Sequence, residues 1–189
     1  KHLEFAEAKK WTDGWVGLAH HIVVCTSAFF IIMFDPEPSA NEDRMYGFSD
    51  RINMVFSIST AYFMWDINTS MVQGLNDKKV YIHAVVCTLC YIFGQYPFLH
   101  YYGIRFLLFE VSSVFMQLRQ LILLSDMRNT PLFSMVQATF GITFLVTRIL
   151  YGIPLSLAFW NESIDLLLHG KPHSYYVVVF YFLANVILN

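Results

Sequence analysis

Long apolar runs separated by short polar stretches dominate this chain. The clearest run extends from Tyr102 to Leu124 and is interrupted by one glutamate, two serines, two glutamines and two arginines. A run of that length can cross a bilayer as a helix. Polar groups at that depth must face protein, water or ligand, because they are costly in hydrocarbon. Glu110, Ser113 and Gln117 lie along one stripe of this helix, and other polar residues lie roughly opposite. The helix is therefore expected to sit inside a bundle.

The same pattern predicts six membrane-spanning helices. The fifth should be kinked at Pro154, which removes a backbone donor. Residues 1–14 are charged and are predicted to form an interfacial segment, with Trp11 and Trp15 as anchors, which leaves 15–189 for the transmembrane domain. The predicted spans are 15–34, 52–72, 80–98, 102–124, 131–160 and a last helix that begins near Tyr175.

Composition supports an all-α membrane protein and narrows its chemistry. Only 14% of the residues are charged, whereas soluble domains carry about a quarter. The net charge of −2 and the lack of a basic cluster argue against a nucleic-acid partner. Cys87 and Cys90 are interpreted as small apolar fillers, because redox chemistry requires an electropositive, water-accessible site. Histidines and carboxylates do not recur four residues apart on one predicted span, so no metal or other cofactor is expected, apart from a bound lipid.

Basic residues give a weak indication of orientation. The N-terminal segment and the turns at 74–79 and 125–129 hold six Lys and Arg residues, and the opposite side holds four. This difference favours an N-terminus on the cytosolic or matrix side. Six spans would place both termini on that same side.

Six ionisable residues within the predicted spans are costly there: His20, Asp66, His83, Glu110, Arg119 and Arg148. One interpretation is structural, with Asp66 or Glu110 neutralising an arginine on a neighbouring helix. A second hypothesis places His83, Asp66 and Glu110 around one cavity as a proton-transfer or acyl-transfer site. The sequence leaves both open. In either case Glu110 should be buried within reach of a cation or histidine from the third or fifth helix.

The order of these polar residues resembles the TLC-domain family, a membrane domain shared by translocating-chain-associating proteins, ceramide synthases and several small lipid-related proteins. The resemblance extends from about residue 15 to residue 189 and implies a six-helix, TLC-type bundle. It rests on Leu18-Ala19-His20-His21, Ala61-Tyr62-Phe63-Met64-Trp65-Asp66, Val80-Tyr81-Ile82-His83, Glu110-Val111-Ser112-Ser113 with Gln117 and Arg119, and Thr147-Arg148-Ile149 with Pro154.

Departures from the family pattern bear on activity. In the family that this chain resembles, the catalytic ceramide synthases carry two adjacent histidines in the third helix, followed by two aspartates. Here Ala84 follows His83 and no such aspartates follow. Val114 also stands where the family often has proline. We therefore expect the fold without ceramide synthase turnover.

The expected function is non-catalytic binding or sensing of lipid, including sphingolipid-related lipid, in an intramembrane cavity. The candidate lining residues are His20, Asp66, His83, Glu110, Ser113, Gln117 and Arg148. One alternative is an acyl-CoA-dependent N-acyltransferase that uses His83 with Asp66 or Glu110. Another is an accessory subunit of a larger membrane complex, such as a mitochondrial respiratory complex. The expected partners are membrane lipids and, in the last case, other membrane-protein subunits. Family analogy implies the endoplasmic reticulum, with the mitochondrial inner membrane as the alternative.

Overall fold

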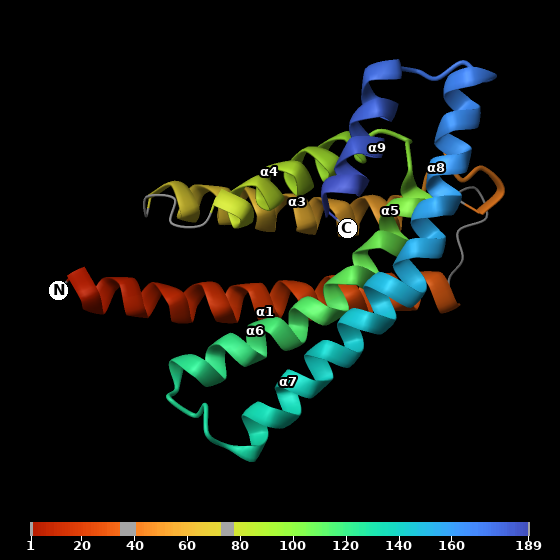
Figure 1. Ribbon diagram of the computed structural model, residues 1–189. Helices are drawn as coiled ribbons and strands as arrows, with labels where there is room; N and C mark the ends of the chain where they lie inside the picture. The colour runs from red at the N-terminus through yellow and green to blue at the C-terminus, as the bar shows by residue number, and fades with distance from the viewer. Residues whose placement is uncertain (1, 35–40, 73–77, 189) are drawn as a thin grey trace.

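The described residues fold into a bundle of six helical stretches, three of which are long and apolar enough to span a membrane. The computed structural model describes residues 2–34, 41–72 and 78–188 (Figure 1). The elements are α1 (His2–Phe34), α3 (Asp50–Val72), α4 (Lys78–Phe93), α5 (His100–Phe106) continued by η1 (Leu107–Phe109) and α6 (Glu110–Leu124), α7 (Pro131–Phe144) continued by η2 (Leu145–Tyr151) and α8 (Gly152–Leu168), and α9 (Tyr175–Leu188). The prediction of an all-α bundle with six helices is confirmed at this level.

Length and apolar composition together identify three candidate membrane spans. These are Ala8–Phe34, His100–Leu124 and Pro131–Leu168. Two further helices, Tyr81–Phe93 and Tyr175–Leu188, are apolar but shorter. The three long apolar helices indicate an integral membrane protein. Of the six predicted spans, these criteria identify the first, fourth and fifth.

The predicted boundaries of two helices were wrong. The third was expected to reach residue 98, but α4 ends at Phe93 and a bend leads to α5. Gly94 and Pro97 follow the end of α4, and Leu99, just before α5, has a φ of 60°, in the left-handed region, so α4 does not continue into α5. The fifth helix extends to Leu168 and contains the π-helical segment η2 shortly before Pro154. A wider turn beside a proline rearranges the hydrogen-bond ladder where the donor is missing.

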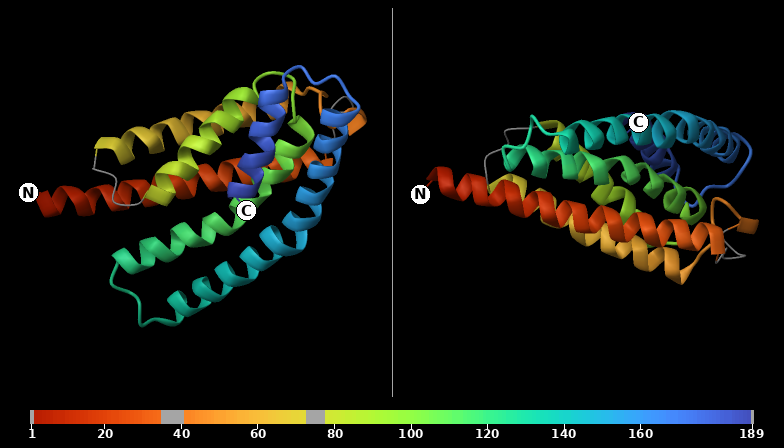
Figure 2. Two further views of the ribbon diagram at one scale, coloured as in Figure 1. Left: turned by 45° about the horizontal axis from the view of Figure 1, so that its top comes forward. Right: turned by 90° about the horizontal axis from the view of Figure 1, so that it is seen from below.

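The first helix is longer than the predicted span. α1 runs without interruption from His2 to Phe34, so the predicted interfacial segment continues directly into it. It lies alongside both α3 and α6 (Figures 1 and 2). Two glycines permit the close approach to α6. A Cβ atom at Gly17 would lie 2.6 Å from Nε2 of Gln117, and one at Gly14 would lie 2.7 Å from a methyl group of Leu121. Small residues at helix interfaces let backbones approach in this way.

At the end of the bundle opposite the N-terminus, the 41–49 loop is fastened to α8. Nη1 of Arg44 donates a hydrogen bond to Oε1 of Glu162 at 2.8 Å. This bond to Glu162 raises the pKa of the Arg44 guanidinium above its usual value. The Arg44 guanidinium also lies 5.0 Å from the centre of the Tyr101 ring, in a cation–π arrangement. The loop therefore covers the start of α5, where the candidate cavity described below ends.

Candidate functional site

Glu110 begins α6 and is the most deeply buried acid in the described bundle. Only 8% of the residue is exposed. Its Oε2 lies 3.3 Å from Nδ1 of His21 on α1. The two atoms do not form a hydrogen bond, so the contact is electrostatic. The prediction that Glu110 is buried near a histidine or cation is confirmed, but the nearest such group comes from the first helix instead of the third or fifth.

On one side, Glu110 lines a cavity enclosed by α3, α4, α5, η1, η2, α8 and α9. Its volume is about 780 Å³, counting the open mouth. Most of its lining is apolar or aromatic, and the ionisable side chains Glu110, His83 and Arg148 are part of it. We call this space the aromatic cavity; its aromatic lining consists of Phe56, Tyr91, Phe98, Tyr102, Phe106, Phe109, Phe159 and Tyr181.

The charged groups and the largest aromatic cluster lie at different ends of the aromatic cavity. At one end, Arg148 from η2 donates from Nη1 to the carbonyl oxygen of Leu188 at 3.1 Å. Its guanidinium also lies 5.8 Å from the centre of the Phe109 ring, next to Glu110 in sequence. At the other end, Phe98 lies 5.6 Å, centre to centre, from the ring of Tyr181. The helix that connects the two ends, His100 to Glu110, spans about 15 Å. The cavity is therefore elongated and amphipathic.

His83 and Cys87 face each other within the lining, one turn apart on α4. Nε2 of His83 lies 3.5 Å from Sγ of Cys87. Cys87 is buried and Cys90 is partly buried, and both are free thiols that line the aromatic cavity. The two cysteines were predicted to be apolar fillers, and the structure adds that both form part of the wall of a cavity.

On its other side, Glu110 faces polar residues from α1, α3 and α6. His20 and His21 are 7% and 5% exposed. The imidazole of His20 stacks on the ring of Tyr62 at 3.8 Å between centres and 8° between planes. A Cβ atom at Gly17 would meet both the Gln117 amide and the Tyr62 hydroxyl, at 2.6 and 3.1 Å, so these two groups converge on α1.

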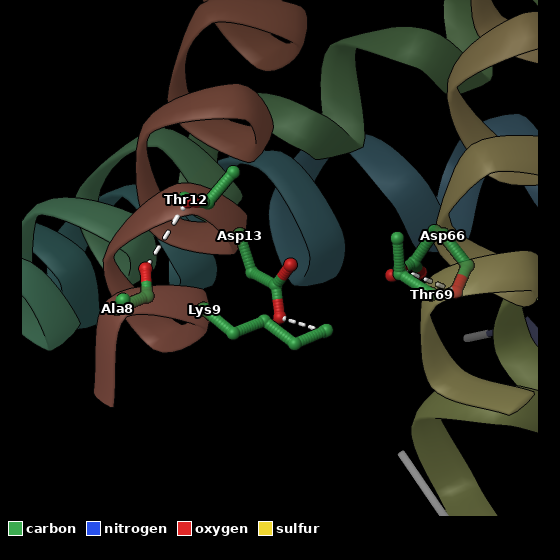
Figure 3. A network of polar contacts seen from close by, with 6 residues as sticks. All are labelled: Ala8, Lys9, Thr12, Asp13, Asp66 and Thr69. Carbon is green, nitrogen blue, oxygen red and sulfur yellow. Dashed lines mark hydrogen bonds and ion pairs between the residues drawn. The ribbon is translucent and has the colours of Figure 1, made fainter. Parts of the chain in front are cut away.

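The outer end of this polar region lies near the start of α1. Lys9 and Asp13 form an ion pair one turn apart. Asp66 on α3 lies opposite them (Figure 3), close enough for the charges of both to act on its carboxylate. Thr69 donates its hydroxyl to the backbone oxygen of Asp66 at 3.0 Å. We call this region the polar seam; it consists of Asp13, His20, Tyr62, Asp66 and Gln117 around Gly17.

The predicted lining residues divide between these two regions. His83, Glu110 and Arg148 line the aromatic cavity. His20, Asp66 and Gln117 belong to the polar seam instead, and Ser113 is buried one helical turn from Glu110. The sequence predicted one cavity because all seven face the bundle interior. A helical stripe shows which side of a helix is buried but not which neighbour covers it.

The predicted charge pairs between helices are not formed among the described residues. Arg119 donates from Nε to the Gln137 side chain on α7, and Arg148 donates to a backbone oxygen. Asp66 lies near Lys9, and Glu110 near His21. No hydrogen-bonded arginine–carboxylate pair therefore links these helices among the described residues, although the charges of His21 and Arg148 both act on the Glu110 carboxylate.

Sequence reasoning missed His21 and Tyr62 as site residues. His21 appeared in a motif, but adjacent histidines point about 100° apart on a helix, and the phase of α1 alone does not show which one meets Glu110. Tyr62 had no signal of its own, because tyrosines are frequent in this chain. The structure also shows that an adjacent histidine pair does lie at the centre of the bundle, supplied by α1 and not by the helix that holds His83.

Comparisons with known proteins identify the family of this chain. The family model of the TLC domain matches residues 10–189. An uncharacterized TLC domain-containing protein of Schizosaccharomyces pombe is 26% identical over 195 residues, an alignment that covers 100% of this chain and 66% of the relative. The chain thus spans slightly less than two thirds of that relative's length. No solved structure matches the chain significantly. Because the family match extends over nearly all of its residues, the chain belongs to the TLC-domain family.

Proposed function

We propose that this TLC-domain protein binds a membrane lipid in the aromatic cavity without converting it. The observation that carries the proposal is the amphipathic lining, with ionisable groups at one end and aromatic rings at the other. Ligand sites are typically apolar concavities with a few polar groups that fix orientation. An acyl or sphingoid chain would lie among Phe98, Tyr102 and Phe159, with its polar end near Glu110.

The polar end suits a head group that both donates and accepts hydrogen bonds. Arg148 offers donors, the Glu110 carboxylate offers acceptors, and His83 can do either according to its tautomer. Because one cation and one anion line this end, a neutral or zwitterionic head group with hydroxyl or amide functions fits better than a doubly charged phosphate. Sphingolipid-related lipids belong to that class.

Lipid that co-purifies with matched variants tests the proposal. Ala184 lines the aromatic cavity from α9 and is 3% exposed, whereas Ala138 is exposed on α7. Ala184→Phe should fill the cavity and lower bound lipid, measured by mass spectrometry of the purified protein, about tenfold, which corresponds to about 1.4 kcal/mol. Ala138→Phe adds the same bulk outside the cavity and should leave bound lipid unchanged. Equal amounts of specifically retained lipid in both variants would contradict the proposal.

Catalysis of acyl transfer is a second candidate, favoured by the histidine pair beside Glu110. A carboxylate 3.3 Å from an imidazole can orient it and stabilise its charged form during proton transfer. Neither His20 nor His21 is among the residues that line the aromatic cavity, so a bound lipid would meet Glu110 before it met the pair. Incubation with a sphingoid base and acyl-CoA decides between the candidates. Binding without conversion predicts no ceramide above the level of a His21→Ala variant.

We place the protein in the endoplasmic reticulum membrane by analogy with its family. The three long apolar helices support a membrane location of some kind, and the compartment is part of the proposal. Imaging of the full-length protein with a fluorescent tag tests it. Co-localisation with a marker of the mitochondrial inner membrane would instead support the accessory-subunit alternative.

A further inference from the structure

The polar seam contains buried polar atoms that the described protein residues do not satisfy. His20 is only 7% exposed, and both of its ring nitrogens are buried without a hydrogen-bond partner among the described residues. Oε1 of Gln117 and Oδ1 of Asp13 share this condition within the described part of the chain. Buried polar atoms cost free energy unless they are hydrogen-bonded, so native proteins commonly satisfy them with ordered water.

These atoms lie in sequence along one interface, from the start of α1 to Glu110. Asp13, Gly17 and His20 are spaced at i, i+4 and i+7, so they share one face of α1. Tyr62 and Asp66 are one turn apart on α3, and Gln117 lies two turns beyond Glu110 on α6. The distance along α1 from Asp13 to His21 is about 12 Å. Polar groups thus continue from the charged residues in Figure 3 to the histidine pair.

We infer that the polar seam is a hydrated proton path that connects Glu110 with the aqueous phase near Lys9 and Asp13. Water molecules along it would donate to and accept from the His20 ring, the Gln117 amide and the Tyr62 hydroxyl. A proton taken from water at the outer end passes along these waters and His20 to His21 or to the Glu110 carboxylate. No bond between heavy atoms forms or breaks, and the proton returns by the same route. This inference does not depend on the proposed lipid binding.

The position of Glu110 gives the path an end point. Ionisable groups on four elements lie close enough for electrostatic interaction with this carboxylate. They are His20, His21 and Cys25 from α1, Tyr62 from α3, His83, Cys87 and Tyr91 from α4, and Arg148 from η2. It is therefore the one described acid that contacts the polar seam through His21 and also lines the aromatic cavity. Intramembrane chains of acids and histidines commonly serve as proton relays.

Gly17 provides a means of blocking the path. A side chain there would occupy the space between the Gln117 amide and the Tyr62 hydroxyl. Gly17→Leu should therefore displace the water. Gly141→Leu is a matched control, because a Cβ atom at Gly141 would meet nothing within 4 Å. Gln117→Leu removes the amide with little change of size, and it replaces Gly17→Leu if that variant fails to fold.

Two readouts in lipid nanodiscs test water and protons separately. Radiolytic hydroxyl labelling, followed by mass spectrometry, detects water beside Tyr62. Labelling should fall about tenfold in Gly17→Leu or Gln117→Leu and remain unchanged in Gly141→Leu. Infrared spectroscopy after a pH jump follows the Glu110 carboxyl, identified by its loss in Glu110→Gln. Its response should slow about tenfold in the blocked variants alone.

The two readouts have outcomes that would overturn the inference. Tyr62 labelling that is equal in the wild type and the blocked variants would show that the seam is dry. A Glu110 signal that is absent in the wild type, or equally fast in all variants, would show that the seam does not carry protons to it. Neither outcome bears on lipid retention in Ala184→Phe, so failure here is distinguishable from failure of the proposed function.

Discussion

The two sides of Glu110 differ in how their buried surface is satisfied. The aromatic cavity is lined mainly by aromatic and aliphatic side chains, with Glu110, His83 and Arg148 as the charged or basic members of its lining. The polar seam has imidazole, amide and carboxylate atoms with no partner among the described residues. An apolar space favours a hydrocarbon ligand, whereas a polar space favours water. One helix, α6, begins with the acid that contacts both.

Because of this difference, the residues on the two sides of Glu110 contribute differently to the stability of the fold. Aromatic rings around the cavity pack against each other and against the loops, so they contribute to folding as well as to the shape of the site. Polar residues of the seam contribute little net packing, because buried polar contacts are offset by desolvation. Substitutions on the two sides should therefore have different effects.

The largest effect is expected where the two regions meet. Glu110→Ala leaves His21 buried without its acidic neighbour and opens the cavity wall. Leaving a buried polar group without its neighbour costs about 1–3 kcal/mol, and truncating a packed side chain to alanine adds about 2–5 kcal/mol. We expect a strongly lowered midpoint of thermal unfolding in detergent, together with loss of bound lipid. Glu110→Gln keeps the shape of the side chain, so the midpoint of unfolding should fall less and more lipid should stay bound. A midpoint within 1 °C or so of the wild type for Glu110→Ala would contradict a central position for this acid.

A smaller loss is expected on the cavity side alone. Phe159 is 1% exposed and packs against Tyr102, with 5.3 Å between ring centres. Phe159→Ala should destabilise by about 3 kcal/mol, because it leaves a void in a packed cluster. It should also shift the retained lipids towards bulkier chains, measured by mass spectrometry. Unchanged chain length would show that Phe159 does not border the bound lipid.

On the seam side, loss of a polar group should cost little stability. Gln117→Leu replaces an amide whose Oε1 has no partner among the described residues. Its free energy of unfolding should stay within about 1 kcal/mol of the wild type, since replacing a poorly satisfied buried polar group by an apolar one is often nearly neutral. Chemical denaturation in mild detergent measures it. A loss as large as that of Phe159→Ala would remove the distinction between the two sides.

The smallest effect is expected at the exposed ion pair between Arg44 and Glu162. The Arg44 and Glu162 side chains are 48% and 32% exposed. Exposed ion pairs contribute about 0.2–1 kcal/mol and are screened by salt. Arg44→Gln should lower stability by about 0.5 kcal/mol at low ionic strength, with less effect in high salt. An effect that persists undiminished in high salt would point to the Tyr101 contact as the main term.

The sequence predicted the helices better than it predicted their neighbours. Apolar runs gave six helices, because hydrophobic length is a local property. The 94–98 stretch contains Gly94 and Pro97, residues that commonly follow the end of a helix, so the end of α4 could have been predicted. The left-handed backbone at Leu99, in contrast, depends on tertiary contacts, including its N–H bond to the carbonyl of Met45.

The residues of the candidate site could be predicted from the sequence, but their division between the aromatic cavity and the polar seam could not. Glu110 and His83 were identified from the cost of charge in a membrane. Their separation from Gln117 and Asp66 depends on which helices pack together. That arrangement follows from Gly14 and Gly17, which bring α1 against α6 and place His21 beside Glu110. No helical stripe contains this information.

The most direct test of the central claim is an experimental structure of the full chain in lipid, at a resolution that shows bound acyl chains. Lipid binding in the aromatic cavity predicts elongated density between Phe98 and Glu110, with its polar end within hydrogen-bond distance of Glu110, His83 or Arg148. A cavity closed by its own side chains, or a lipid whose head group lies at the Phe98 end, would contradict the account.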